Sequence, residues 1–517
     1  MNKNTIILLI SIVALASFLR LWDLKNLPPG LYPDEAMNGN NALEATATGN
    51  YKMFYPENNG REGLFINLQA MSLKIFGNEP WALRLIAALF GILTVLGTFF
   101  LARELFKRDR LALLAAFFIA TSFWHINFSR IGFRAIMAPF FLTWSLYFLW
   151  NAINDRQNDK PKSAWDALKS AFGGILFGFG FHSYISYRVA PALLALPFFK
   201  ILQKRGEKCS MCQLAIFILF ALIAAAPLGI YFLENPADFL GRTSQLSIFS
   251  TDAPLQQLGL NIVKTAGMFW IAGDYNWRHN LSGTPELWWP IGILFIIGII
   301  TAIRALVANY KSYLNYWLLF LWIAIGLLPV IISNEGIPHA LRAIIVIPPV
   351  LILAAVGAEK LLDYLAVKWT NRQIAILLSV FIIAVAAQSY IQYFKRWGQN
   401  ENTFYAFSEN YANLGHRLAS EPREIPKYIV ANASGDDVRG VPMPAQTVMF
   451  LTDTFRTFEQ AAKNLYYVLP QNLAQISCDA TCVIALLEYD SSIISALQKQ
   501  IPELHVDIGQ GFVILQK

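Results

Sequence analysis

The sequence has few charged residues for a chain of 517 residues, and this scarcity excludes an ordinary soluble protein. Charged residues make up 15% of the chain and hydrophobic residues 56%, with a mean hydropathy of +0.43. These values indicate a polytopic membrane protein. The formal net charge of +7 requires no nucleic-acid partner, because basic loops between hydrophobic segments account for most of it.

Cysteines are also few, and they form two close pairs. Cys478 and Cys482 lie in the C-terminal part of the chain, where they can form a local disulfide. Cys209 and Cys212 make a single CxxC motif with no further Cys or His nearby, which is weak evidence for zinc. We interpret this second pair as structural or incidental.

Motifs for metals and nucleotides are absent as well. No HExxH-like spacing occurs, so we predict no obligatory metal cofactor, although Glu62 and a distant histidine can ligate one divalent ion. The C-terminal part lacks a Gly-rich nucleotide fingerprint, and the chain has no internal repeat or low-complexity tract.

Long apolar runs dominate the first 400 residues. The first, Ile6–Leu21, is too long for a signal-peptide core and lacks a convincing cleavage site, so we expect it to remain as a helix. With it, the runs of spanning length predict about eleven transmembrane helices. The other ten lie near residues 82–103, 111–125, 135–151, 170–187, 189–203, 213–233, 287–307, 315–333, 340–361 and 373–394.

Lys and Arg in alternate short loops predict the orientation of these spans. We assign the basic loops to the cytoplasmic side, together with the N-terminus. We therefore expect a multi-pass protein of the plasma or inner membrane, whose first outer loop (24–79) and C-terminal part are extracytoplasmic. The basic residues are Lys107, Arg108 and Arg110; Arg156, Lys160 and Lys162; Lys200, Lys204, Arg205 and Lys208; Arg304 and Lys311; Lys368 and Arg372.

The chain changes character near residue 396, which predicts a membrane module over 1–395 and a small α/β domain over 396–517. Short β-rich runs alternate there with polar, helical-looking stretches at 457–464 and 491–500, a pattern typical of α/β domains. The expected strands lie at 428–432, 447–451, 466–469, 483–487 and 512–515.

The first outer loop carries the acidic residues that best suggest chemistry. Asp34 and Glu35 lie just beyond the first span, where a charge near lipid is costly unless something compensates it. Two segments, 34–48 and 64–76, have the spacing of interfacial helices, and a turn-rich stretch between them contains Arg61 and Glu62. A carboxylate can accept the proton of an attacking acceptor, and Arg can bind phosphate. Alternatively, the acidic pair stabilises the first turn of a helix.

The loop and its surroundings resemble one superfamily. The order is a span, Pro33-Asp34-Glu35, an interfacial helix, a turn with Glu62, a second interfacial helix and the sequence WALRL at 81–85. This arrangement is similar to the GT-C membrane glycosyltransferases, specifically to dolichyl-phosphate-mannose–protein mannosyltransferases and aminoarabinose lipid A transferases. The similarity covers most of the first 400 residues and is most specific over about 20–135. Later stretches similar to bacterial members are 129–135, 182–188, 278–280 and 338–342.

The resemblance implies the GT-C fold and transfer of a sugar, with inversion, from a polyprenyl-phosphate donor. It implies that Asp34 is the general base, with Glu35 as a supporting catalytic residue and Glu62 as a second acid. Relatives often continue after this second acid with Lys-Pro, whereas this chain has Gly63-Leu64, so a phosphate-binding Lys of some relatives is absent. Arg61 is our candidate to replace it.

Other polar residues near the predicted outer boundary are further candidates. For the donor phosphate these are Arg130, Arg134, Arg188 and Arg342, and for other substrate contacts they are His182, Tyr184, Arg278, His279, Asn280 and His339. If residues 130–134 are helical, the two arginines there share a face. The alternatives are snorkelling of arginines to lipid headgroups and interfacial anchoring by aromatic residues.

The predicted function is therefore an inverting glycosyltransferase whose partners are a polyprenyl-phosphate sugar, membrane lipids and a protein, lipid or glycan acceptor. One rival is an oligosaccharide polymerase or ligase that uses a lipid diphosphate donor. Another is a non-enzymatic transporter of lipid-linked sugars. A transporter is expected to align charges across several spans, whereas here the ionisable residues cluster at one boundary.

Overall fold

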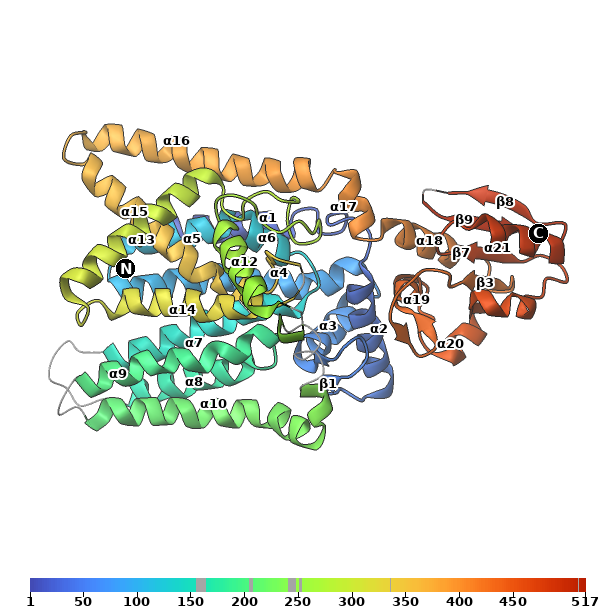
Figure 1. Cartoon of the computed structure of the whole chain (residues 1–517), viewed down its shortest axis with the longest axis horizontal. Coiled ribbons are helices and arrows are strands. Elements are labelled where there is room, and N and C mark those ends of the chain that lie inside the picture. Colours follow the sequence, from blue (N-terminus) through green and yellow to red (C-terminus); the bar gives the residue numbers. More distant parts are fainter. Residues whose placement is uncertain (155–163, 204–207, 240–247, 251–252, 335, 510) are drawn as a thin grey trace. The chain divides into compact units, whose positions relative to one another are not determined.

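The computed structural model describes the whole chain except residues 155–163, 204–207, 240–247, 251–252, 335 and 510 (Figure 1). The described residues form two compact units. The first unit contains residues 1–22 and 87–397, and the second contains residues 23–86 and 398–517. The predicted division had placed the loop 24–79 with the spans, whereas in the structure this loop groups with the C-terminal residues. Parts of two predicted basic loops, at 156–162 and 204–205, lie outside the described residues.

The first unit is almost entirely helical. Its α-helices are α1 (Lys3–Leu21), α4 (Pro80–Phe106, shared with the second unit), α5 (Asp109–Thr121), α6 (Phe123–Phe128), α7 (Met137–Asn154), α8 (Ala164–Gly180), α9 (Ala195–Gln203), α10 (Lys208–Glu234), α12 (Pro254–Gly267), α13 (Trp289–Asn309), α14 (Leu314–Ile331), α15 (Ile347–Leu365) and α16 (Asn371–Tyr390). Shorter 3-10 segments are η1 (Arg134–Ile136), η2 (Ile185–Leu194), η3 (Ile248–Ser250) and η4 (Ile344–Val346), and η5 (Ile391–Trp397) is a π-helix.

Within the described residues, nine helical segments are long and apolar enough to cross a membrane. Two further predicted spans, 111–125 and 170–187, fall on α5 and α8, which have 13 and 17 residues. The first is short because α5 stops at Thr121, and the side chain of Ser122 then caps α6 by accepting the His125 N–H. The chain is thus a multi-pass membrane protein by the length and composition of its helices.

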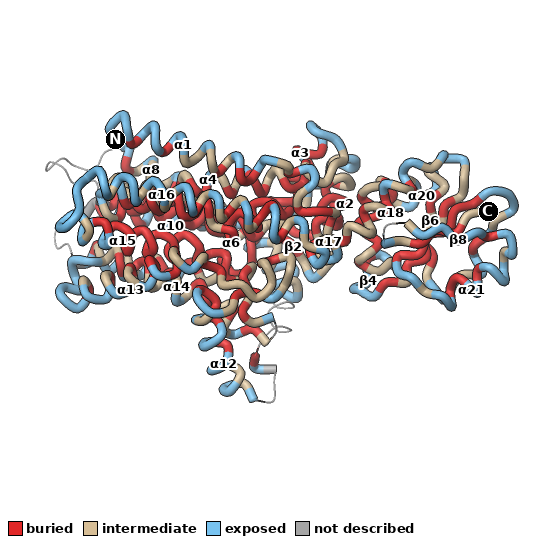
Figure 2. Tube along the Cα trace, turned by 90° about the horizontal axis from the view of Figure 1, so that it is seen from above, coloured by how far each residue is buried: buried red, intermediate tan, exposed pale blue. Residues whose placement is uncertain are grey.

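Helix burial differs sharply within the first unit (Figure 2). In α15, 89% of the apolar window is buried, whereas in α16 only 11% is buried. The backbones of α13 and α15 approach closely where Gly298 and Gly357 meet, and a Cβ atom on either glycine would lie 1.9 Å from a carbonyl oxygen of the facing helix. Small residues at such crossings allow tight packing between membrane helices.

The second unit begins with the first loop. Its elements there are α2 (Pro33–Thr48), the two-residue strands β1 (Phe54–Tyr55) and β2 (Arg61–Glu62), and α3 (Gly63–Phe76). The two predicted interfacial segments are therefore helical. Their apolar sides share a core with Tyr55, Leu83 and Phe450, so residues distant in sequence hold the loop in place.

The C-terminal residues add a five-stranded sheet with flanking helices. The sheet order is β6-β3-β7-β9-β8, in which β3 is parallel to β6 and β7, and β9 is antiparallel to both of its neighbours. The strands are β3 (Lys427–Val430), β6 (Leu465–Val468), β7 (Val483–Leu486), β8 (His505–Ile508) and β9 (Val513–Gln516), and β4 (Asp437–Val438) with β5 (Val441–Pro442) forms a separate hairpin. The helices are α17 (Glu401–Ala406), α18 (Glu409–Ala419), α19 (Gln446–Thr452), α20 (Thr457–Ala462) and α21 (Ser491–Gln500), with 3-10 segments η6 (Met443–Ala445) and η7 (Pro470–Gln475).

One predicted strand is wrong, and one strand of the five-stranded sheet, β8, was not predicted, nor were the short strands of the two hairpins. Residues 447–451 form the helix α19, because Val448 and Met449 pack in one core while Phe450 packs in the core of the first loop. The contacts of a helix thereby override the β propensity of these residues. Strand β8 is exposed along its whole length, so it lacks the alternation that would reveal it. Cys478 and Cys482 form a disulfide with a Cα–Cα distance of 5.6 Å.

Candidate active site

The first acidic pair lies in the first turn of α2. Tyr32 precedes the helix with extended backbone angles, and Pro33 occupies the first helical turn, where its missing N–H is tolerated. Asp34 is half-buried, and its Oδ1 atom accepts a hydrogen bond from the Asn58 side-chain amide at 2.6 Å. This contact ties the carboxylate of Asp34 to the turn after β1.

The neighbouring Glu35 is fully buried and forms an ion pair with Arg84 of α4. The Arg84 guanidinium donates to both carboxylate oxygens, at 2.9 and 3.1 Å. It also donates to the carbonyl oxygens of Pro28, at 2.5 Å, and Gly30, at 2.8 Å. These four bonds join the start of α2, the segment before it and α4, so Glu35 orients the helix turn that carries Asp34.

Glu62 and Arg61 lie on β2, which pairs with β1. Glu62 is buried, and the N–H of Gly63 next to it donates to the Met53 carbonyl at 2.8 Å. Arg61 is buried, and its guanidinium donates to the side-chain oxygens of Asn38, at 2.7 Å, and Asn41, at 2.5 Å. Arg61, proposed from the sequence as a phosphate ligand, therefore connects β2 to α2 in this structure.

Arg439, on the β4–β5 hairpin, holds the other side of this loop. Its guanidinium donates to both oxygens of Glu44 and to Glu57, each at 2.9 Å. Burial raises the pKa of Glu57, but the hydrogen bond and charge of Arg439 outweigh it, and the pKa is lowered overall. Nearby, the Asn59 amide donates to Asp436 at 3.1 Å.

The turn that carries Asn58 has an unusual backbone. Asn58, Asn59 and Gly60 have φ angles of 52°, 61° and 79°. Asn and Gly adopt this left-handed region more readily than other residues. The sequence Asn-Asn-Gly therefore suits a tight turn that directs the Asn58 amide towards Asp34.

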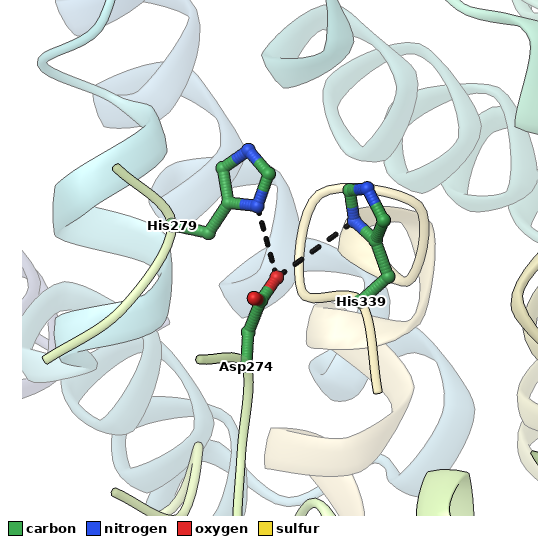
Figure 3. Close-up of side chains that lie close together, drawn as sticks. All are labelled: Asp274, His279 and His339. Atoms are coloured by element: carbon green, nitrogen blue, oxygen red, sulfur yellow. Dashed lines mark hydrogen bonds and ion pairs between the residues drawn. The ribbon is translucent and has the colours of Figure 1, made fainter. Parts of the chain in front are cut away.

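A second polar cluster lies in the first unit, in the loop that follows α12 (Figure 3). Asp274 is buried, and its Oδ2 atom lies 2.9 Å from His279 Nδ1 and 3.8 Å from His339 Nδ1. The same oxygen accepts the backbone N–H of Ala340 at 2.8 Å, and Oδ1 accepts that of Asn276 at 2.8 Å. The loop and the turn before η4 thus meet at one carboxylate.

Backbone contacts shape this loop. The Asn280 amide donates to the carbonyl oxygens of Thr284, at 2.6 Å, and Asp274, at 3.3 Å. A Cβ atom at Gly273 would lie 2.3 Å from the Thr284 carbonyl oxygen, so glycine is required there. Asn127 donates to the Arg278 carbonyl at 2.8 Å, which attaches the loop to α6.

Several charged groups surround this cluster. Burial lowers the pKa of Arg278 to about 10. Burial also raises the pKa of Glu286 well above its ordinary value, and the charge of Asp274 adds to the effect. Arg342 donates to the Ser333 hydroxyl, and its backbone N–H lies 3.4 Å from His339 Nδ1. The predicted residues Arg278, His279, Asn280, His339 and Arg342 therefore come together, although they lie on two segments.

The remaining predicted residues of the first unit lie in other surroundings. Arg130 is buried 5.1 Å from the rings of Tyr393 and Phe394, and Arg134 lies 5.7 Å from the ring of Tyr184. The two arginines do not share a helical face, because α6 ends at Phe128 and a turn precedes η1.

His182 and Arg188, the other two predicted residues, each contact a backbone carbonyl oxygen. His182 Nε2 lies 3.1 Å from the Ala224 carbonyl oxygen. Arg188 donates to the Phe239 carbonyl oxygen at 3.0 Å and lies 4.1 Å from its ring. Neither residue belongs to the cluster of Asp274, His279 and His339.

Sequence reasoning missed four residues that organise these clusters, namely Asp274, Arg84, Asn58 and Arg439. Arg84 lies within the WALRL stretch, and Asp274 precedes the Arg278-His279-Asn280 stretch, so their proximity to those motifs was an available signal. Asn58 and Arg439 have no such signal, because their partners are set by tertiary contacts.

Comparisons with known proteins agree on the fold. The family described as dolichyl-phosphate-mannose-protein mannosyltransferase matches residues 64–231. ArnT from Cupriavidus metallidurans in the apo state matches with a TM-score of 0.62 and 14% sequence identity, over 99% of this chain and 98% of that chain. The same protein bound to undecaprenyl phosphate matches with a TM-score of 0.59 and 13% identity, over 100% and 98%.

A more distant likeness is to AglB, the oligosaccharyltransferase of Archaeoglobus fulgidus, in complex with an inhibitory peptide and a dolichol-phosphate. Its TM-score is 0.56 at 14% identity, over 93% of this chain and 69% of that chain. The chain has the GT-C fold. The predicted resemblance and fold class are thereby confirmed, while a comparison with curated proteins finds no match.

We expect the Glu35–Arg84 pair to be a major source of stability in the second unit. Arg84→Met leaves a buried carboxylate without its partner, and breaking such a pair costs about 3–5 kcal/mol. Thermal unfolding of the purified protein in detergent should show a clearly lower melting temperature. The control is Lys517→Met, which removes the pair between a partly exposed lysine and the exposed Glu503 and should change the melting temperature little. Equal melting temperatures for the two variants would contradict this role.

The Arg439 clamp should depend on pH. Because the folded pKa of Glu57 lies below its ordinary value of 4.5, the stability from this pair is present above that pH and is lost as the pH falls through the lowered pKa. Arg439→Met should therefore have a lower melting temperature than the wild type at pH 7. The difference in melting temperature between the two proteins should shrink progressively below pH 4.5. A difference that stays constant down to about pH 3, across the range in which carboxylates titrate, would refute the expectation.

Proposed function

We propose that this protein is a glycosyltransferase that moves a sugar from a polyprenyl-phosphate donor to an acceptor, with inversion at the anomeric carbon. The observation that carries the proposal is the half-buried Asp34, held by the Asn58 amide at 2.6 Å at the start of α2. The GT-C fold and the mannosyltransferase family match at residues 64–231 support the reaction class. ArnT bound to undecaprenyl phosphate and AglB with dolichol-phosphate support a lipid phosphate as the leaving group.

In the proposed reaction, an acceptor hydroxyl or amine attacks the anomeric carbon of the donor. Asp34 takes the proton of the acceptor as the new bond forms. The bond between the anomeric carbon and the phosphate oxygen breaks, and polyprenyl phosphate leaves with the electron pair. A single displacement inverts the configuration at that carbon.

The roles of the other residues follow from their contacts. Glu35 and Arg84 fix the turn that carries Asp34, and Glu62 remains the second acid proposed for the loop. Arg342 stays our candidate for the donor phosphate, since it brings positive charge, together with Arg278, to the Asp274 cluster. The acceptor is a protein, a lipid or a glycan on the extracytoplasmic side. The basic residues in alternate loops support a cytoplasmic N-terminus in the plasma or inner membrane.

Asp34→Asn tests the proposed base. The substitution preserves size but removes the proton acceptor, so transfer should fall by at least about 100-fold, the lower range of general-base effects. The assay uses purified protein in nanodiscs with polyprenyl-phosphate sugars and candidate acceptors. Asp507→Asn, on the exposed strand β8, is the matched control and should keep full activity. Full activity in Asp34→Asn would show that Asp34 is not the general base. Analysis of the lipid product separates a monophosphate from the diphosphate expected of a ligase or polymerase.

Asn58→Asp tests the positioning of that base. The change keeps the side-chain shape but replaces the amide donor with a carboxylate that repels Asp34. We expect kcat to fall by about 10-fold or more with little change in KM, because the base loses its orientation while contacts that bind the substrate remain. Asn50→Asp, at an exposed position after α2, is the control and should keep the wild-type kcat. Equal kcat values in the two variants would contradict a special role for Asn58.

A further inference from the structure

We propose that Asp274, His279 and His339 form a binding site for one divalent cation of the zinc class. One ligand atom from each residue lies within 4.8 Å of the others, which is a separation that a single ion can bridge after small adjustments. No sequence motif with metal-ligand spacing predicts this site, because His339 is distant in sequence from the loop that contains Asp274 and His279. The proposal departs from our expectation, from sequence, of no obligatory metal.

Three side chains, and not only one hydrogen-bonded pair, meet at this place. The hydrogen bond of 2.9 Å between His279 Nδ1 and Asp274 Oδ2 fixes the orientation of the His279 ring. The Nδ1 atom of His339 also turns towards the same carboxylate oxygen, at 3.8 Å (Figure 3), so the two histidines approach one oxygen of Asp274 from two segments. The two rings lie side by side, with centroids 4.9 Å apart. The proposed ion lies between these three groups, where it can contact one ligand atom of each.

The surrounding contacts orient the proposed ligands. Backbone N–H groups of Asn276 and Ala340 each donate to one carboxylate oxygen of Asp274 at 2.8 Å. The Asp274 N–H donates to Glu286 Oε1 at 3.0 Å. His339 Nδ1 accepts the Arg342 N–H at 3.4 Å, so this nitrogen carries a lone pair, and metal binding would replace this long hydrogen bond. Such outer contacts typically fix the orientation of metal ligands.

The donor types select the metal. Two imidazole nitrogens and one carboxylate oxygen suit zinc, whereas calcium and magnesium prefer oxygen ligands throughout. Three protein ligands leave a fourth tetrahedral position for water. The positive charges of Arg278 and Arg342 oppose a cation, so the negative charge of Asp274 should be essential for binding. When bound, the cation would link the 273–286 loop to the turn before η4.

Metal binding by the full-length protein in detergent tests the proposal. The protein is stripped with a chelator and titrated with Zn²⁺ by calorimetry, and bound Co²⁺ is examined by visible absorption. We expect about one equivalent of Zn²⁺ per chain, a tetrahedral Co²⁺ spectrum and a higher melting temperature with zinc. Asp274→Asn and His339→Ala should each weaken binding by about 100-fold or more, since even outer-contact substitutions cost 10–100-fold.

The control is His505→Ala, which removes an exposed histidine of β8 and should bind zinc like the wild type. We expect His339→Ala to fold like the wild type, because this histidine is less buried than His279, so this variant keeps the test valid where another variant fails to fold. Wild-type protein that binds no zinc would overturn the proposal. So would zinc bound equally well by wild type, Asp274→Asn and His339→Ala, since the ion would then lie elsewhere. None of these measurements depends on glycosyltransfer, so they remain informative if the proposed activity fails.

Discussion

The buried ion pair between Glu35 and Arg84 is the constraint on which the candidate base depends. A charge buried without a partner is unfavourable by several kcal/mol, and a well-formed pair recovers this only when its remaining hydrogen-bonding groups are satisfied. Here both carboxylate oxygens accept from Arg84, and the guanidinium also serves two backbone carbonyls. The pair thus fixes the direction in which α2 begins, and with it the position of Asp34.

The C-terminal residues complete the same scaffold. Arg439 binds Glu44 of α2 and Glu57 of the following turn, and α19 contributes Phe450 to the core of the first loop. The Asn40 amide also donates to the Gln446 side chain at 2.9 Å. These contacts give the C-terminal segment a structural role that its sequence did not suggest. It holds the turn whose Asn58 contacts Asp34, so substitutions in the tail can affect the base without contacting a substrate.

Local signals and tertiary contacts explain what could be predicted from the sequence. The helices predicted at 34–48 and 64–76 followed from the spacing of their polar and apolar residues, which α2 and α3 match, and apolar runs located the long spans. Residues 447–451 misled the strand prediction because their partners come from elsewhere in the fold. The same limit applies to the site. Asp34 stood out beside the first span, and His279 and His339 stood out as polar groups near a boundary. Their convergence on Asp274 arises only when two distant segments meet.

The contacts of the three loop acids also distinguish their chemistry. A carboxylate already paired with a guanidinium is a poor proton acceptor, because taking up a proton breaks the ion pair, and Glu35 is in this position. Glu62 is buried on β2. Asp34 is half-buried and accepts a hydrogen bond from a neutral amide, so it can take a proton without breaking an ion pair with that partner. In a chain with so little charge, this combination of partial exposure and a neutral, orienting contact is what favours Asp34 as the base.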